Sequence, residues 1–281
     1  MNSNDQDMST STSTGSNGTL ITFNGDRLPR RIFIFCLSFE IFLVLFDVIV
    51  NWGKLINIGA IRRLANIARE DGFATWFMVA QTLVAGLVLW LIFMVYRSRQ
   101  ESRGKVFAWG FLAGFFTYMS ADDASKIHER LGTAFSKIVP EKGASSSDGF
   151  FGWLQSIFPS YDWQIAVLPL FVGIGFFMLF FLLREFHDRK NKILLFVAVG
   201  CMALAVVIDF FEGLDNSHAW KIERWIWEAL DTRRYNVTHF AKALEEFLEM
   251  LSISLLLMLF TRHLIQTTNS SLAIDFSPKQ T

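Results

Sequence analysis

The sequence lacks the motifs that mark disulfide-rich, metal-thiolate and nucleotide-binding proteins. It has only two cysteines in 281 residues, Cys36 and Cys201, and each lies inside an apolar run. The chain therefore has neither a disulfide framework nor a thiolate metal site. It also contains no Gly-x-Ser-x-Gly elbow, phosphate loop or dinucleotide fingerprint, so no common hydrolase or nucleotide-binding motif identifies an activity.

Charged residues are scarce as well. They make up 19% of the chain, 26 basic against 26 acidic, and the basic residues form short clusters beside apolar runs. Such a distribution gives no surface that could follow a phosphate backbone, so nucleic acid is not an expected partner. Hydrophobic residues reach 52% and include 30 Phe, which indicates a protein whose main partner is the lipid bilayer.

The apolar residues form long blocks of membrane-spanning length. A spanning helix needs about 20 mostly apolar residues, and we therefore predict an all-α, polytopic transmembrane helix bundle of about six spanning helices. The predicted spans are 32–52, 73–96, 106–128, 164–183, 193–212 and 239–261. Amphipathic patterns at 54–71 and 220–230 predict further helices that lie flat in the membrane interface.

Arg and Lys clusters fall at the same side of the membrane if the six helices alternate in direction. The positive-inside rule makes that side cytoplasmic, so both termini are expected in the cytoplasm. The polar residues 1–26 predict a disordered cytoplasmic tail, 27–266 a single transmembrane domain and 267–281 a short polar C-terminal tail. The clusters are Arg27/Arg30/Arg31, Arg97/Arg99/Arg103/Lys105, Arg184/Arg189/Lys190/Lys192 and Arg262.

The main functional signal is a band of acidic residues inside the predicted spans. A charged side chain at the membrane centre costs about 2.5–3.5 kcal/mol on insertion scales, so each needs a partner, a water cavity or a bound proton. All of them fall in the outer half of the membrane by our topology. They are Asp47 on the first span, Asp122 and Asp123 on the third, Asp209 and Glu212 on the fifth, and Glu245, Glu246 and Glu249 on the last.

Helical spacing places several of these acids on common faces. Asp122, Ser125 and Glu129 recur at i, i+3 and i+7, with His128 beside them; His239, Lys242, Glu246 and Glu249 follow the same rule on the last span. An alternative is that Asp122 with Lys126, and Lys242 with Glu246, form ordinary ion pairs within their helices. The recurrence of acids on several helices favours one shared polar cavity.

The first functional hypothesis is binding of a cation or metal for transport, sensing or structure. Carboxylate-rich sites suit Ca²⁺, Mg²⁺ or Mn²⁺, and mixed His and carboxylate ligation also admits Fe. The candidate ligands are Asp122, Asp123, His128, Glu129, Asp209, Glu212, Glu245, Glu246 and Glu249, with Asp47, Ser125, His239 and Lys242 as further cavity residues.

Two alternatives stay open. One is a metal-dependent, membrane-embedded enzyme, a hydrolase or an oxidase; the Glu-x-x-His pairs typical of di-iron bundles do not occur in the sequence. The other is a structural or accessory subunit, in which the acids pair with basic residues of another membrane subunit or of a second copy in a homo-oligomer.

Three segments carry a resemblance to a family. They are Ser120-Ala-Asp-Asp-Ala-Ser-Lys-Ile-His-Glu-Arg-Leu, Glu245-Glu-Phe-Leu-Glu-Met, and Ile67-Ala-Arg-Glu-Asp-Gly-Phe-Ala-Thr-Trp-Phe. They resemble an uncharacterised family of bacterial polytopic inner-membrane proteins with a D-D/E-A-x-x-x-H-E motif on the third span and an E-E-x-x-E-M motif on the last. The resemblance implies a bacterial inner membrane and a polar site shared by these two spans, and it implies no mechanism.

Overall fold

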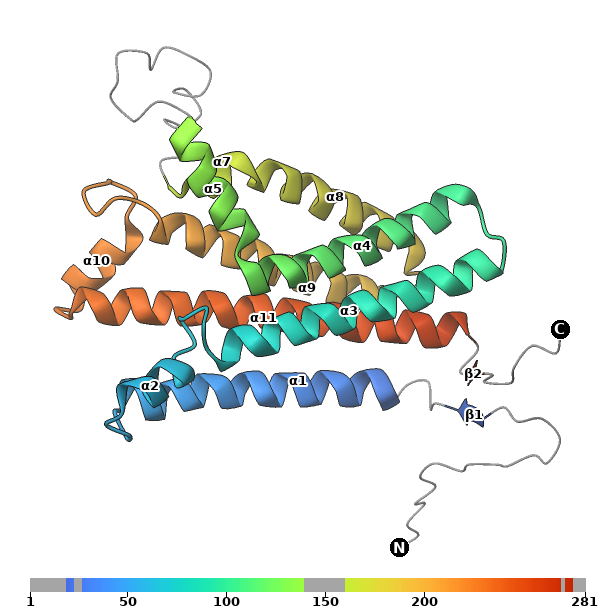
Figure 1. Cartoon of the computed structure of the whole chain (residues 1–281), viewed down its shortest axis with the longest axis horizontal. Helices are drawn as coiled ribbons and strands as arrows, with labels where there is room; N and C mark the ends of the chain where they lie inside the picture. Colours follow the sequence, from blue (N-terminus) through green and yellow to red (C-terminus); the bar gives the residue numbers. More distant parts are fainter. Residues whose placement is uncertain (1–18, 23–26, 139–159, 269–270, 275–281) are drawn as a thin grey trace, which may run out of the picture.

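The computed structural model describes residues 19–22, 27–138, 160–268 and 271–274. Helices account for most of this part of the chain, and the longest ones lie along the long axis of the molecule (Figure 1). The long helices are α1 (Arg27–Phe46), α3 (Phe73–Ser98), α4 (Arg103–Ser125), α8 (Leu168–Glu185), α9 (Arg189–Glu212) and α11 (Arg234–Thr267). The shorter ones are η1 (Asp47–Trp52), which continues α1, and α2 (Gly59–Ala65), α5 (Ile127–Ile138), α7 (Asp162–Ala166) and α10 (Ile222–Ala229).

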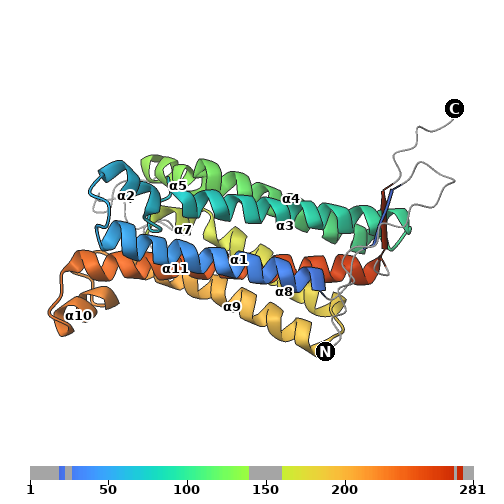
Figure 2. The ribbon, with the colours of Figure 1, turned by 90° about the horizontal axis from the view of Figure 1, so that it is seen from below.

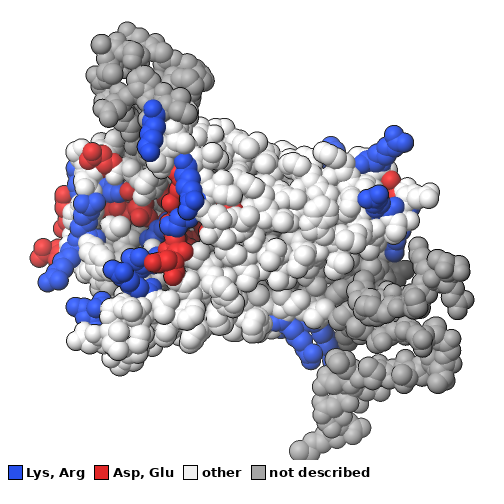
Figure 3. Space-filling view, in the orientation of Figure 1, with Lys and Arg blue, Asp and Glu red and all other residues white. Residues whose placement is uncertain are grey.

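Four helices have the length and hydropathy of membrane spans. These are α1 extended by η1, α3, α8 and α9, and they fit a membrane protein. α4 and α11 are of similar or greater length, but each also carries charged residues. On the face shown in Figure 3, the surface between the two ends is almost free of charge, while Lys, Arg, Asp and Glu gather at the ends. Large apolar side chains such as Phe35, Phe107 and Phe180 are exposed along this belt, as expected for a surface solvated by lipid.

The core lies around α11, which packs against α1, α3 and α9 (Figure 2). Every residue from Ser252 to Thr261 is buried, so this part of α11 has protein on all sides. The ring of Phe260 packs edge-on against that of Phe116 from α4 at 5.4 Å between centroids. α3 and α4 approach closely at Gly86, where an added Cβ would lie 3.3 Å from the backbone nitrogen of Thr117; small residues commonly permit such approaches between membrane helices.

Both chain ends lie at the same end of the bundle (Figure 1). There β1 (Thr19–Thr22) pairs antiparallel with β2 (Ser271–Ile274), with Thr19 opposite Ile274. The sequence analysis placed both segments in polar tails and predicted no strand. The remaining tail residues, 1–18, 23–26, 269–270 and 275–281, lie outside the described residues.

Helix boundaries differ from the predicted ones at two important places. The predicted span 106–128 ends at Ser125, because Lys126 adopts the left-handed conformation with φ 54° and stops the helix. The predicted span 164–183 begins only at Leu168, after the separate short helix α7. These breaks place α5 and α7 across the end of the bundle.

The two predicted interfacial helices have different outcomes. Between 54 and 71 only Gly59–Ala65 is helical, whereas 220–230 contains α10 with an amphipathic sequence. Residues 139–159, between α5 and α7, lie outside the described residues.

Candidate functional site

The predicted site residues lie at the end of the bundle opposite the chain termini. This end is formed by the C-terminal ends of α4 and α9, the N-terminal half of α11 and the short helices α5, α7 and α10 (Figure 1). Its surface shows both basic and acidic side chains, whereas the other end shows mostly Lys and Arg (Figure 3). The acids predicted on different helices therefore lie toward one end of the bundle.

α11 supplies three carboxylates and one cation within two turns. Glu245 and Glu246 are only 3% and 6% exposed, and Glu249 is partly buried one turn further on. The Nζ atom of Lys242 lies 2.7 Å from Oε1 of Glu245 and 3.9 Å from Oε1 of Glu246. The local pair that the sequence suggested, Lys242 with Glu246, is thus the longer of two, and the single lysine is shared.

Carboxylates of two other helices approach this group. Asp123 of α4 is near enough to Glu249 for charge repulsion, and it also interacts with Glu246. Asp209 of α9 interacts electrostatically with Lys242 and Glu249. We call Asp123, Asp209, Glu245, Glu246 and Glu249 the acidic cluster. Three helices that are distant in sequence therefore place carboxylates in one region.

α7 and the chain after α9 complete the surroundings of Asp209 and Glu212. Gln164, which is 1% exposed, donates from Nε2 to Oδ2 of Asp209 at 2.9 Å. Lys221 is almost fully buried, and its Nζ donates to the carbonyl oxygens of Phe211 and Glu212 at 3.1 and 2.5 Å. The ammonium thus satisfies the C-terminal carbonyls of α9. Sequence analysis placed Lys221 on the polar face of an interfacial helix and missed this role.

Asp122 points to a different partner from the one that its spacing suggested. Because α4 ends at Ser125, Asp122, Ser125 and Glu129 do not form the continuous helical stripe that we predicted, and Ser125 is exposed. Asp122 instead accepts from the backbone nitrogen of His128 at 2.8 Å, and its Oδ2 lies 2.7 Å from the Nδ1 of the same residue. Burial disfavours the imidazolium, but the hydrogen bond and charge of Asp122 outweigh it and raise the pKa of His128.

Glu70 is a member of the site that the sequence analysis did not list. It lies in the connection before α3 and forms an ion pair with Lys126. It also shares a hydrogen bond with Glu129 of α5. Burial and the nearby charge of Glu70 raise the pKa of Glu129. Burial acts in the same direction on Glu70, but hydrogen bonds from Lys126 and Glu129 outweigh it and lower its pKa.

Asp47 and His239, both predicted as cavity residues, bind one another. His239 Nε2 lies 2.8 Å from Oδ2 of Asp47, and Asn51 donates to Oδ1 of the same carboxylate at 2.9 Å. Asp47 and His239 are 1% and 4% exposed. This buried contact joins the end of α1 to the start of α11. The buried polar atoms that form this contact have hydrogen-bond partners, as is usual for a pair with a structural role.

The described residues contain no group of three or more His, Cys, Asp and Glu side chains arranged to hold a metal ion. The predicted Ca²⁺, Mg²⁺, Mn²⁺ or Fe site accordingly stays a prediction.

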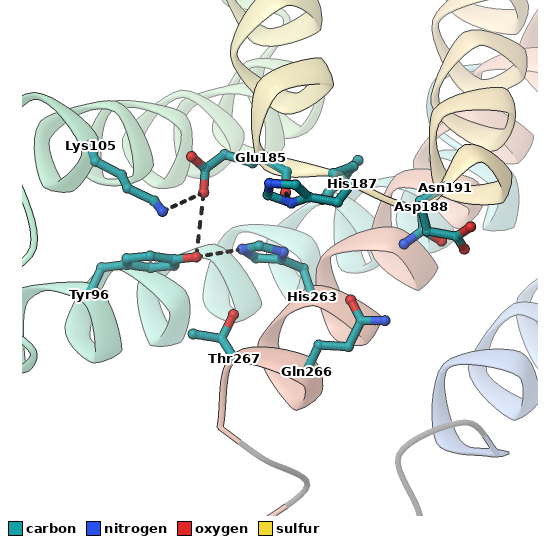
Figure 4. A pocket seen from close by; sticks show the side chains of 10 residues that line it. Tyr96, Lys105, Glu185, His187, Asp188, Asn191, His263, Gln266 and Thr267 are labelled. Atoms are coloured by element: carbon teal, nitrogen blue, oxygen red, sulfur yellow. Dashed lines mark hydrogen bonds and ion pairs between the residues drawn. The ribbon is translucent and has the colours of Figure 1, made fainter.

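A second polar network lies at the opposite end of the bundle, around a cavity of about 340 Å³ (Figure 4). The hydroxyl of Tyr96 lies 3.0 Å from Nε2 of His263 and 3.4 Å from Oε2 of Glu185. Glu185 also pairs with Lys105 at 3.0 Å. None of these four residues was among the candidate site residues predicted from the sequence, in which Lys105 was named only as part of a basic cluster.

Between the two ends, Glu40 is fully buried in a compact hydrogen-bonded group. Ser254 donates to its Oε1 at 2.5 Å, and Gln81 donates to the same oxygen at 2.9 Å. Gln81 Nε2 also lies 2.8 Å from Oγ of Ser254. This group links α1, α3 and α11 through side chains inside the bundle.

Comparison with known proteins assigns a family to the chain. A family model described as "Domain of unknown function (DUF8692)" matches residues 36–263, which cover all of the long helices except the first residues of α1 and the last of α11. The chain therefore belongs to this family. No curated protein and no solved structure matches it.

Proposed function

We propose that this member of the DUF8692 family crosses the membrane six times and binds cations, chiefly protons, at the acidic cluster. The four apolar helices fit a membrane protein, and α4 and α11 lie alongside them in the same bundle. At a rise of about 1.5 Å per residue, the 23 residues of α4 extend about 34 Å, enough for the hydrocarbon core. In α11 the polar residues Glu245, Glu246, Ser252 and Ser254 are buried inside the protein.

The distribution of charge supports an orientation. The chain termini share one end with the basic clusters, and the acidic cluster lies at the other end. The positive-inside rule then places the termini in the cytoplasm and the acidic cluster toward the outer face. We further propose a bacterial inner membrane, as the family resemblance implies.

The observation that carries the proposal is the meeting of carboxylates from α4, α9 and α11 around one lysine. Glu245 and Glu246 are nearly inaccessible, and Lys242 is the cation paired with both of them. Like charges at close range in a medium of low dielectric constant repel strongly. Such a group of carboxylates is stable only when it binds protons or other cations, and the number bound depends on the concentration of these cations. The cluster is thus suited to sensing or moving cations.

Protons are favoured over a fixed metal by the contacts of the cluster. Two of its carboxylates already have hydrogen-bond donors, because Lys242 donates to Glu245 and Gln164 donates to Asp209. Carboxyl groups in membrane proteins commonly serve as proton carriers. The metal-dependent enzyme and the accessory subunit remain hypotheses, since no contact of the described residues distinguishes them from a cation-binding protein.

Infrared spectroscopy of the full chain in nanodiscs tests the proposal. We expect a signal from protonated carboxyl groups at neutral pH, which decreases in Glu246→Gln and in Asp123→Asn. Glu185→Gln, at the opposite end of the bundle, is the matched control and should leave the signal unchanged. A parallel titration with Ca²⁺, Mg²⁺ and Mn²⁺ measures any metal binding at the same cluster.

The result can contradict the proposal in one clear way. If the wild type shows no protonated carboxyl at neutral pH and none of the three metals binds, the acidic cluster does not take up cations. The cluster would then be a structural network of charges, neutralised by partners from another subunit.

A further inference from the structure

A separate cavity of about 540 Å³ opens at the same end of the bundle as the acidic cluster. Its walls come from the end of η1, from α2 and from the segment that joins α10 to α11, and it shares no residue with the acidic cluster. In Figure 1 these elements lie side by side at the left end of the molecule, where α2 and α10 flank the start of α11. The cavity is therefore formed by connections that are distant in sequence.

The charge of this cavity is the reverse of that of the acidic cluster. Three cationic side chains, Lys54, Arg62 and Arg233, line it together with one carboxylate, Asp231. Arg62 is fixed in place because its Nε donates to the carbonyl oxygen of Asn51 at 3.2 Å. Arginine and lysine that converge on a concave surface favour an anion, and the planar guanidinium suits phosphate oxygens in particular.

Two residues of the wall have an uncommon backbone conformation. Lys54 has φ 52° and Asp231 has φ 46°, which makes them two of the four non-glycine residues with positive φ among those described. A residue with a Cβ is strained in the left-handed region, and such strain is concentrated at ligand-binding and functional positions. Both connections therefore have the left-handed conformation at a residue that lines the cavity.

The aromatic part of the wall indicates the depth of the cavity in the membrane. Trp52 and Tyr235 stack with their ring centroids 6.0 Å apart and an angle of 7° between their planes. Trp and Tyr are enriched at the level of lipid headgroups, where one side of the ring is apolar and the other is hydrated. The cavity accordingly lies where the phosphate of a phospholipid, or a small soluble phosphate, can enter from the aqueous side.

We propose that this cavity is a binding site for a phosphate group, held by Arg62, Arg233 and Lys54. The group is carried either by the headgroup of an anionic phospholipid or by a small soluble phosphate ester. The volume exceeds that of a phosphate alone and lies in the usual range of small-molecule sites, about 300–1,000 Å³. This site is additional to the proposed cation-binding function and does not depend on it.

The experiment has two arms, both with the purified full chain. In the first, calorimetry measures the binding of glycerol 3-phosphate in a non-ionic detergent. In the second, native mass spectrometry counts phosphatidylglycerol molecules retained from micelles that contain equal amounts of phosphatidylglycerol and phosphatidylcholine. The double variant Arg62→Gln/Arg233→Gln is compared with Arg99→Gln/Arg189→Gln, which loses the same charge from exposed positions at the opposite end.

We expect binding in at least one arm, weakened about tenfold or more in the Arg62/Arg233 variant and unchanged in the control, since each lost arginine removes a charge-assisted hydrogen bond. Binding of glycerol 3-phosphate identifies a soluble ligand, and selective retention of phosphatidylglycerol alone identifies a lipid headgroup. Absence of binding in both arms, or an equal loss in the control, overturns the proposal. Lys54→Gln, at an exposed position, provides the same comparison if the double variant does not fold.

Discussion

The Nδ1 atom of His128 lies 2.7 Å from the Oδ2 atom of Asp122, across the break that separates α4 from α5. The backbone nitrogen of His128 donates to the other oxygen of the same carboxylate at 2.8 Å. Two hydrogen bonds to the buried carboxylate of Asp122 thus anchor the first turn of α5. The ring of His128 also packs edge-on against Trp163 of α7 at 5.1 Å between centroids. The side chain of His128, which can be protonated, therefore connects α5 to both α4 and α7 at this end of the bundle.

The first prediction concerns the pH dependence of this attachment. The pKa of His128 is raised above its unfolded value of about 6.5. Its contribution to stability is therefore fully present below about pH 6.5 and is lost as the pH rises through the higher pKa of the folded state. Nuclear magnetic resonance of labelled histidine, assigned with His128→Gln, should show this raised value. Asp122→Asn should lower it, because the variant removes the hydrogen bond and the charge that raise it. An unchanged titration in Asp122→Asn would contradict the role of the pair.

The second prediction compares two buried serines of α11. Ser254 donates to Glu40, whereas the hydroxyl of Ser252 has no hydrogen-bond partner among the described residues. Ser254→Ala leaves part of the bonding capacity of a buried carboxyl group unused, and it should reduce the free energy of unfolding by about 1–3 kcal/mol. Ser252→Ala removes an unsatisfied hydroxyl and should leave stability unchanged or slightly increased. Thermal unfolding in detergent measures both, and equal losses would show that the bond to Glu40 contributes nothing.

The third prediction concerns the packing of α5 on α7. A Cβ added at Gly132 would lie 2.6 Å from the backbone nitrogen of Trp163, too close for any side chain, whereas at Gly114 nothing lies within 4 Å. Gly132→Ala should therefore destabilise the protein by about 1–3 kcal/mol. Gly114→Ala, which gains the same helix propensity without a clash, should be neutral or stabilising. Paired melting curves give the difference, and similar values for the two variants would be inconsistent with the close contact.

The fourth prediction concerns orientation. Lys190 and Ser217 are exposed at opposite ends of α9. In a background without Cys36 and Cys201, Ser217→Cys should react with a membrane-impermeant maleimide applied to intact cells, and Lys190→Cys should react only after permeabilisation. The positive-inside distribution is the reason for this assignment. Labelling of both positions from the same side would exclude α9 as a spanning helix.

The helical architecture could be predicted from the sequence because the bilayer sets a strong length requirement. Blocks such as 73–96 and 193–212 contain too many consecutive apolar residues for a soluble helix, and α3 and α9 lie close to those bounds. The concentration of acids at one end also followed from counting along alternating helices. Hydropathy does not identify a spanning helix that carries several charged residues, however. α4 and α11 carry acids at one end, and hydropathy alone does not qualify them as spans.

The side-chain partners within the site could not be predicted because they depend on the backbone conformation of one residue, Lys126. Lysine rarely adopts positive φ, and nothing in the residues around Lys126 signals that the helix stops there. The break changes the partner of Asp122 from Lys126 to His128 and brings Lys126 to Glu70. Glu70 itself lies outside the predicted spans, so no energetic argument identified it. Pairing of β1 with β2 is a contact between the two ends of the chain, which local patterns do not encode.

The position of α11 has a consequence for biosynthesis. Protein surrounds this helix from Ser252 to Thr261, yet it is synthesised after the other five long helices of the bundle. The earlier helices can enter the bilayer one by one, but they have no finished centre on which to pack until α11 has been synthesised. A nascent chain that stops before residue 234 should therefore remain a loose set of inserted helices and be exposed to quality-control proteases, however many of its spans are already in place.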